Sequence, residues 1–173
     1  EKYKLQNNVR RGRVYRVVHK DYRKKKSPKM FDENTESLVK YLSHQNGWWR
    51  MTAQKEIILR QDKSIASRLQ KLVREGKGIG RIHAMWTMEG LGLAGPEFAL
   101  PLLSDSDHRV RQTAIRLLEP FFLSGDNSYL KNVVSLMKDD NPRVVAQAIN
   151  SIQFLKSSEV TDHILDGMMA NDN

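Results

Sequence analysis

Four short blocks of similar sequence recur along this chain at nearly constant spacing. Each block ends in an alanine, and successive alanines are 31, 30 and 34 residues apart. The blocks are Arg50–Ala53, Arg81–Ala84, Arg111–Ala114 and Val145–Ala148. A regular period of about 30 residues indicates stacked supersecondary units, each too small to bury its own apolar face. We therefore predict an all-α repeat solenoid, an architecture that usually provides a binding surface.

The pattern of apolar residues from Thr35 onward predicts helices in pairs, because the apolar positions recur at helical spacing between turn-forming residues. We expect four helix pairs and a lone final helix from 158 to about 170, with the repeating alanine on the second helix of each pair. After a first helix starting near Thr35, the expected spans are 48–59, 64–73, 79–91, 96–103, 109–122, 129–137 and 143–155. The aligned leucines of the first helices are Leu42, Leu72, Leu102 and Leu136. Because alanine lets neighbouring helices approach closely, the four repeating alanines should be buried.

The N-terminal region differs from the rest of the chain. Residues 12–18 are rich in β-branched and aromatic side chains and predict a single β-strand. A lone strand leaves its backbone groups unpaired, so we interpret residues 1–29 as the end of a preceding β-domain plus a linker, and residues 30–173 as the solenoid. No stretch is long and apolar enough to span a membrane.

The charged residues are also distributed unevenly between the N-terminal region and the rest of the chain. Residues 1–29 carry twelve Lys or Arg and two acidic residues, a net charge of +10, whereas residues 30–173 carry a net charge of −1. Basic runs of this kind bind anions, and here we expect weak, non-specific binding confined to residues 10–29. Cysteine is absent, which excludes disulfides, thiolate metal ligands and a cysteine nucleophile in this segment.

Eight residues in the second helices are the candidate interaction or structural residues. They are Trp48, Trp49, Arg50, Arg81, His83, Trp86, Glu89 and Arg111. Two adjacent tryptophans beside an arginine could stack a base or a sugar, but we favour a packing role, with Trp86 and either Trp48 or Trp49 in the core. His83 and Glu89 could serve acid–base or metal chemistry. A packing role for His83 is again favoured, since the other histidines are scattered, and we assign no catalytic, cofactor-binding or metal-binding residue.

Three of these residues occupy equivalent positions in successive repeats. Arg50, Arg81 and Arg111 each precede a repeating alanine by three residues. In a stack they should form a ladder that reaches the acidic turns, such as Asp105 and Asp107. We interpret this ladder as structural.

The segment Asp107–Ala114 has the form Asp-x-x-Val-Arg-x-x-Ala. This form resembles HEAT repeats, here in a short version, and lacks the signatures of tetratricopeptide or ankyrin repeats. The fold class that we predict is therefore an α-solenoid of short HEAT-like repeats with an N-terminal β-strand remnant.

Three longer motifs carry a second resemblance. They are Gly-Arg-Val-Tyr-Arg-Val at 12–17, Leu-Ser-His-Gln-Asn-Gly-Trp-Trp-Arg-Met-Thr-Ala-Gln at 42–54, and Arg-Ile-His-Ala-Met-Trp-Thr-Met-Glu-Gly-Leu at 81–91. Together they resemble large bacterial membrane-bound dehydrogenases. In that family a β-propeller similar to sugar and sorbosone dehydrogenases precedes HEAT repeats, and a cytochrome c domain with a Cys-x-x-Cys-His haem motif commonly follows.

This resemblance implies that residues 1–29 are the end of a propeller and that the solenoid links it to a haem domain in the periplasm or cell envelope. The implied partners are these two domains or another protein, and haem c is expected elsewhere in the parent and not in this chain. No dehydrogenase chemistry is assigned to any residue here. The alternative function is a nucleic-acid-binding HEAT-like protein that uses the basic N-terminal segment, although the nearly neutral solenoid disfavours it. An enzyme centred on His83 and Glu89 is the weakest of the three hypotheses.

Overall fold

The computed structural model of the chain describes residues 17–23 and 27–154, and in this part the chain forms helices that follow one another in pairs. The first helices of the pairs are α1 (Thr35–Leu38), α3 (Ala66–Glu75), α5 (Pro96–Ala99) and α7 (Leu130–Ser135). The second helices are longer: α2 (Gly47–Arg60), α4 (Ile79–Gly90), α6 (His108–Leu123) and α8 (Pro142–Ile152). Short 3-10 helices extend or precede the first helices: η2 (Val39–Ser43), η3 (Lys63–Ile65), η4 (Leu100–Ser104) and η5 (Leu136–Lys138).

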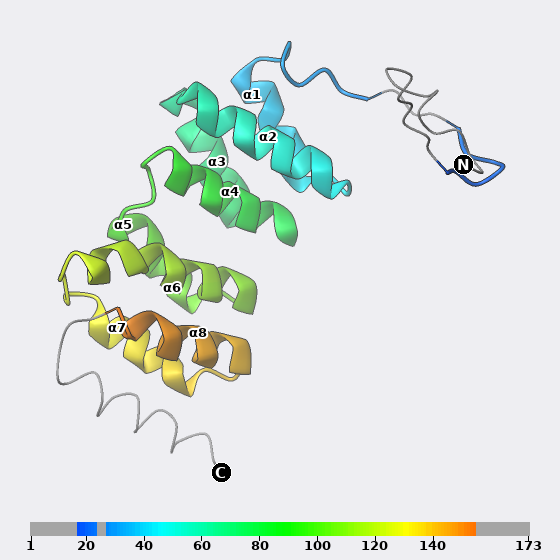
Figure 1. Cartoon of the computed structure of the whole chain (residues 1–173). Coiled ribbons are helices and arrows are strands. Elements are labelled where there is room, and N and C mark those ends of the chain that lie inside the picture. Colours follow the sequence, from blue (N-terminus) through cyan, green and yellow to red (C-terminus); the bar gives the residue numbers. More distant parts are fainter. Residues whose placement is uncertain (1–16, 24–26, 155–173) are drawn as a thin grey trace, which may run out of the picture.

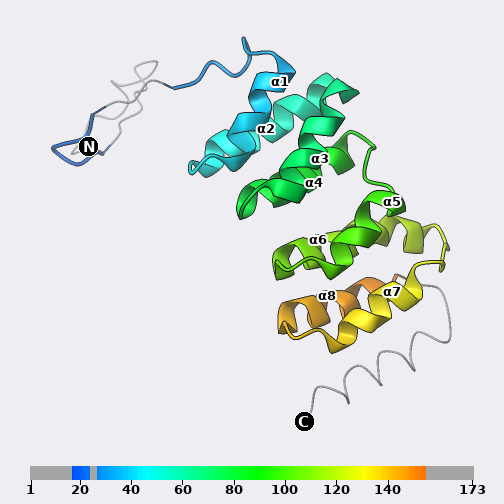
Figure 2. The same cartoon turned by 180° about the vertical axis from the view of Figure 1, so that it is seen from behind.

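The pairs stack in chain order, from α1 and α2 at one end to α7 and α8 at the other (Figure 1). Consecutive second helices contact one another, so that α2, α4, α6 and α8 form one layer. The view from behind shows α1, α3, α5 and α7 as the other layer (Figure 2). This arrangement is the predicted solenoid, in which each unit buries its apolar face against its neighbours.

The repeating alanines lie where the second helices contact their neighbours. Ala53, Ala84, Ala114 and Ala148 are all 0% exposed, as predicted. A side chain of one carbon at these positions allows close helix packing, and the larger core residues surround it.

The predicted leucine alignment of the first helices is partly wrong. Leu42 and Leu102 are buried, but Leu72 and Leu136 are only half-buried. The better series is Leu42, Val73, Leu103 and Met137, whose exposures are 0%, 1%, 5% and 2% and whose spacings of 31, 30 and 34 match those of the alanines. The leucines are 30, 30 and 34 residues apart, one residue short of the alanine spacing at the first step, so Leu72, Leu102 and Leu136 each lie one residue before the equivalent buried position. The first step needs the extra residue because α3 stays α-helical up to its turn, whereas the first helix of the first repeat ends in the 3-10 helix η2.

Side-chain caps explain where the helices begin. Asn46 Oδ1 accepts from Trp48 N at 3.0 Å, Asp107 Oδ1 from Arg109 N at 2.9 Å, and Asn141 Oδ1 from Arg143 N at 3.0 Å. These bonds satisfy backbone donors that have no partner within the helix. The fourth long helix, α4, has no side-chain cap, and its first residue follows Gly78, which adopts a φ of +57°.

The N-terminal β-strand is not supported. Residues 12–16 lie outside the described part of the chain, and Val17 and Val18, which are described, belong to no strand, with Val17 99% exposed. The residues just before α1 pack on the first pair: Met30 is buried, and Arg60 donates hydrogen bonds to the carbonyls of Met30 and Glu33. The predicted final helix also lies outside the described residues. In the described part, no helix is long and apolar enough to cross a membrane.

Candidate interaction surface

The turn between the two helices of each pair positions the polar residues that link successive repeats. In every pair the residue that follows the first helix is extended, and we call it the turn residue. The φ and ψ angles are −70° and 147° at His44, −69° and 174° at Gly76, −67° and 147° at Asp105, and −66° and 145° at Asp139. The four turns are therefore structurally equivalent although their side chains differ.

Arg81 links the second repeat to the third. Its Nη1 donates to Oδ1 of the turn residue Asp105 at 2.9 Å, and its Nη2 donates to Oδ2 of the same carboxylate. Nε donates to the carbonyl of Val73 in its own repeat at 2.6 Å, and the arginine is buried. Burial alone would raise the pKa of Asp105, but the hydrogen bonds from Arg81 and from the backbone N–H of Asp107, together with the charge of Arg81, outweigh it and hold the pKa below its usual value. The predicted ladder is confirmed at this position.

Arg111 links the third repeat to the fourth in the same way. Nε and Nη2 each donate to a different oxygen of the turn residue Asp139, both at 2.7 Å. Nη1 donates at 2.8 Å to the carbonyl of Asp105, in the turn of its own repeat. Such two-point arginine–carboxylate pairs fix geometry as well as charge.

The predicted role of Asp107 in the ladder is wrong. Its carboxylate caps α6 and pairs with Arg109, whose Nη2 lies 2.7 Å from Oδ2. The hydrogen bond from Arg109 lowers the pKa of Asp107 to about 2, despite an opposing effect of burial. Asp107 is the N-cap of its helix and cannot reach Arg81, so Asp105, two residues earlier, accepts from Arg81 instead.

Arg50 reaches a histidine instead of an acidic residue. Its Nε donates to His83 Nε2 at 3.1 Å, and the remaining ring nitrogen, Nδ1, lies 2.7 Å from Gln54 Oε1. Since Nε2 accepts, Nδ1 carries the proton and donates to Gln54. Burial and then the charge of Arg50 lower the pKa of His83, which favours this neutral form. His83 thus joins α4 to α2, a contact that the sequence reasoning missed.

The tryptophans divide into two packed side chains and an exposed one. Trp49 stacks on His44 with ring centroids 4.3 Å apart, and Trp86 packs against the core beneath Arg116, whose guanidinium carbon lies 5.0 Å from the ring centroid. Both are half-buried and pack against the core, so the predicted core role is partly met. Trp48 is 77% exposed. It forms part of the surface of the first pair together with other exposed apolar side chains, among them Phe31 and Met51.

The residues considered for chemistry are not brought together. Glu89 is exposed, and no hydrogen bond or ion pair joins it to His83, both residues being described. Across residues 17–23 and 27–154, no group of three His, Asp or Glu residues could hold a metal ion.

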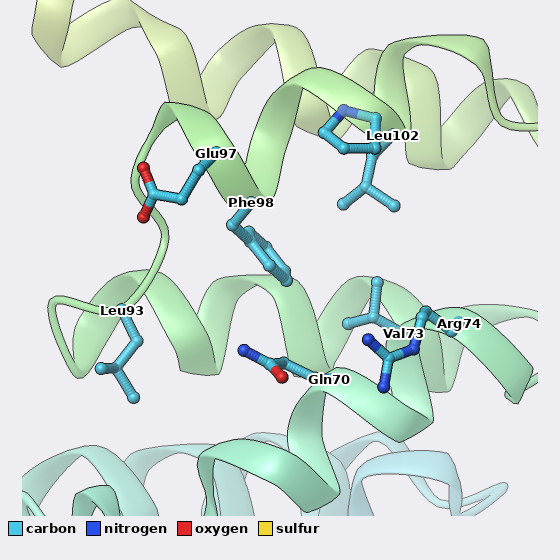
Figure 3. Close-up of a pocket in the computed structure, with 8 residues that line it drawn as sticks. Gln70, Val73, Arg74, Leu93, Glu97, Phe98 and Leu102 are labelled. Atoms are coloured by element: carbon cyan, nitrogen blue, oxygen red, sulfur yellow. The ribbon is translucent and has the colours of Figure 1, made fainter.

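A cavity of about 250 Å³ lies between the second and third repeats, on the side of the first helices. Figure 3 shows Gln70 and Arg74 of α3 on one side of it and Glu97 and Phe98 of α5 on the other. Its lining is mainly apolar and includes none of the eight candidate residues.

Comparison with known proteins supports the repeat assignment. A sequence model of HEAT repeats matches residues 96–173, which include α5 to α8. No curated protein and no solved structure gives a match to the chain. The matched part is a HEAT-repeat region, and the described helices form an all-α solenoid. HEAT repeats are typical of protein-interaction scaffolds, and the polar links described above join successive repeats of this solenoid.

Proposed function

We propose that this chain is a protein-interaction scaffold that links a β-propeller to a cytochrome c domain in a periplasmic or cell-envelope dehydrogenase. The observation that carries the scaffold role is the repeated arginine link between successive helix pairs. Arg81 and Arg111 hold neighbouring repeats at fixed spacing, which gives a stack able to keep attached domains apart. The catalytic chemistry belongs to the other domains and not to this chain.

The dehydrogenase context has a different support. It comes from the motifs at 12–17, 42–54 and 81–91, which together resemble large bacterial membrane-bound dehydrogenases. The middle motif includes the packed Trp49 and the link residues Arg50 and Gln54, and the third includes His83 and Trp86. The resemblance therefore extends over the residues that join the first two repeats.

Isolation of the native protein with antibodies raised against residues 1–173 tests this proposal. We expect a protein much heavier than the 20.0 kDa of this chain, with covalently bound haem detectable by its absorbance and by mass spectrometry. A native protein of the mass of this chain and without haem would contradict the dehydrogenase context and leave the scaffold role.

The second candidate function is nucleic-acid binding through the N-terminal segment. The observation that favours it is the net charge of +10 on residues 1–29. Since residues 30–173 have a net charge of −1, the solenoid itself does not offer the basic surface that phosphate binding needs.

A further inference from the structure

Arg50 and Arg111 have the same orientation in their repeats. Arg50 Nη1 donates to the carbonyls of His44 and Gln45, at 2.7 and 2.9 Å. Arg111 Nη1 donates to the carbonyls at the two equivalent positions, Asp105 and Ser106. Both guanidinium groups therefore direct Nε into the next repeat, and in Arg111 Nη2, on the same edge of the planar group, reaches it as well.

The turns that these two arginines face are opposite in charge. Arg111 faces Asp139 and Asp140, and its Nη2 donates to an oxygen of each. The residues at the equivalent positions of the second repeat are Gly76 and Lys77. The chain thus places a glycine and a cation where the last turn has two carboxylates.

The fold itself prevents an acidic side chain at the first of these positions. A Cβ atom on Gly76 would lie 2.2 Å from the carbonyl oxygen of Leu72, which is backbone and cannot give way cheaply. The acidic residue just before it in sequence, Glu75, is exposed and pairs with Lys71 at 3.8 Å.

The Nη2 atom of Arg50 is available for a further hydrogen bond. Nε is bonded to His83, but Nη2 has no hydrogen-bond partner among the described residues. No side-chain nitrogen or oxygen among those residues is both buried and unpaired, so Nη2 is not fully buried. It lies near Gly47 of its own helix, 3.4 Å from where a Cβ on that glycine would be, and the missing side chain leaves this space free. Asp140 shows that Nη2 alone can hold an exposed carboxylate, because it bonds Arg111 Nη2 at 2.9 Å with its side chain 91% exposed.

We propose that Arg50 Nη2 binds the carboxylate of an acidic side chain on a partner protein, at the place that Asp140 fills for Arg111. The partner's carboxylate completes the ladder at the junction of the first two repeats, where the chain provides none. Lys77 adds positive charge to the same turn and favours an anion there. A guanidinium stays charged, and the bonds of Nε and Nη1 hold Nη2 of Arg50 in a fixed position for a charge-assisted hydrogen bond to a carboxylate. This inference rests on the proposed scaffold function and specifies the chemistry of its partner.

The test is an NMR titration of the full chain, observing the Nε–H resonances of the arginines. The probe is an amide-capped tetraglutamate peptide, with the matching tetraglutamine peptide as the uncharged control. We expect a saturable shift of the Arg50 resonance with tetraglutamate alone, and no comparable shift of Arg81 or Arg111, whose carboxylate partners are already in place. Equal shifts at the surface arginines Arg74 and Arg116 would mean general charge attraction and would overturn the proposal, as would an unmoved Arg50.

Two variants separate the site from the fold. Arg50→Lys keeps the charge but removes the Nη2 donor that the bonds of Nε and Nη1 hold in place, and should weaken tetraglutamate binding at least tenfold. Lys77→Asp supplies an internal carboxylate at the Asp140-equivalent position and should also abolish binding, whereas Lys131→Asp, with the same charge change on α7, should bind nearly as the parent does. Amide spectra of each variant show whether the fold is kept. Undiminished binding by folded Lys77→Asp would refute the site, whether or not the native protein carries a propeller and haem.

Discussion

The two acidic residues Asp105 and Asp107 lie in one turn but differ in how deeply their arginine partners are buried. Arg81 and Asp105 have side chains only 11% and 16% exposed, while Arg109, which pairs with Asp107, is 46% exposed. A buried ion pair whose partner is removed leaves an uncompensated charge, whereas an exposed pair contributes little. The two acidic residues of one turn should therefore differ greatly in their importance for stability.

Asp105→Asn should lower the free energy of unfolding by about 3 kcal/mol, because it leaves the buried Arg81 without its counter-charge. Urea unfolding followed by circular dichroism measures this. Arg109→Gln is the matched control, since it removes an exposed pair and keeps the Asp107 cap; its expected cost is below about 1 kcal/mol. Equal losses in the two variants would show that the buried link is no stronger than a surface pair.

The stability of the chain should depend on pH through His83. Its pKa is lowered in the folded chain, so below the ordinary value of about 6.5 the unfolded chain binds more protons than the folded one. The His83 contribution is therefore present above pH 6.5 and declines as the pH falls below it. His83→Gln retains a donor and an acceptor without titrating, so the variant should lose this part of the pH dependence between pH 7.5 and 5.

The carboxylates affect the stability of the chain in a separate, more acidic pH range. Asp107, with a pKa of about 2, contributes stability above the ordinary aspartate value of about 3.9 and loses it as the pH falls toward 2. Comparing unfolding of the parent and His83→Gln at pH 5 and above isolates the histidine. Identical slopes for the two proteins would contradict the role given to the Arg50–His83–Gln54 contact.

The positions of the helices could be predicted from the sequence, because the repeat spacing and the helix-breaking residues indicate the same helix boundaries. The alanine spacing identified the buried positions of the second helices, and Asn46, Asp107 and Asn141 mark their starts. The register of the first helices was missed by one residue from the second repeat onward, because the aligned leucines do not keep the spacing of the alanines. The missing residue belongs to the second repeat, whose first helix stays α-helical up to its turn, and leucine identity alone does not reveal it.

The candidate site was predictable only where one pattern repeats. Arg81 and Arg111 could be placed near acidic turns from their register alone. The Arg50–His83 contact could not, because nothing in local sequence pairs an arginine of one helix with a histidine 33 positions later. The available signal was negative: the turn at Gly76 and Lys77 lacks the acidic residues found in the third and fourth repeats.

At the level of the helices, Trp86 should matter and Trp48 should not. Trp86 of α4 packs against the core beneath Arg116 of α6, so Trp86→Ala should cost about 3 kcal/mol in unfolding free energy. Trp48→Ala, on the exposed face of α2, should cost less than about 0.5 kcal/mol. Thermal melting of both variants decides this; a larger loss for Trp48 would mean that its helix is packed differently.

At the scale of the whole molecule, charge and fold are segregated. The described stack is nearly neutral, and the basic excess lies in residues 1–29. Any affinity for nucleic acid should therefore be weak, independent of sequence and steeply dependent on salt.

Deleting residues 1–29 should abolish DNA binding as measured by fluorescence anisotropy at 50 and 200 mM salt, because the phosphate contacts are lost. Circular dichroism of the truncated chain serves as the control for folding. Tight DNA binding by the folded, truncated solenoid would support the nucleic-acid function over the scaffold.

The arginine links all point the same way along the stack: Arg50, Arg81 and Arg111 each reach into the repeat that follows their own. Shortening the array is therefore not symmetric. Removing the first pair takes away Arg50 and leaves the two arginine–aspartate links intact. Removing the last pair takes away Asp139 and leaves Arg111 without its carboxylate partner. The first pair can therefore be lost at little electrostatic cost, because the turn of the second repeat has no carboxylate that would be left unpaired, whereas loss of the second pair would leave Asp105 without Arg81. The ladder ends at the fourth repeat, where Val145 takes the place of the arginine.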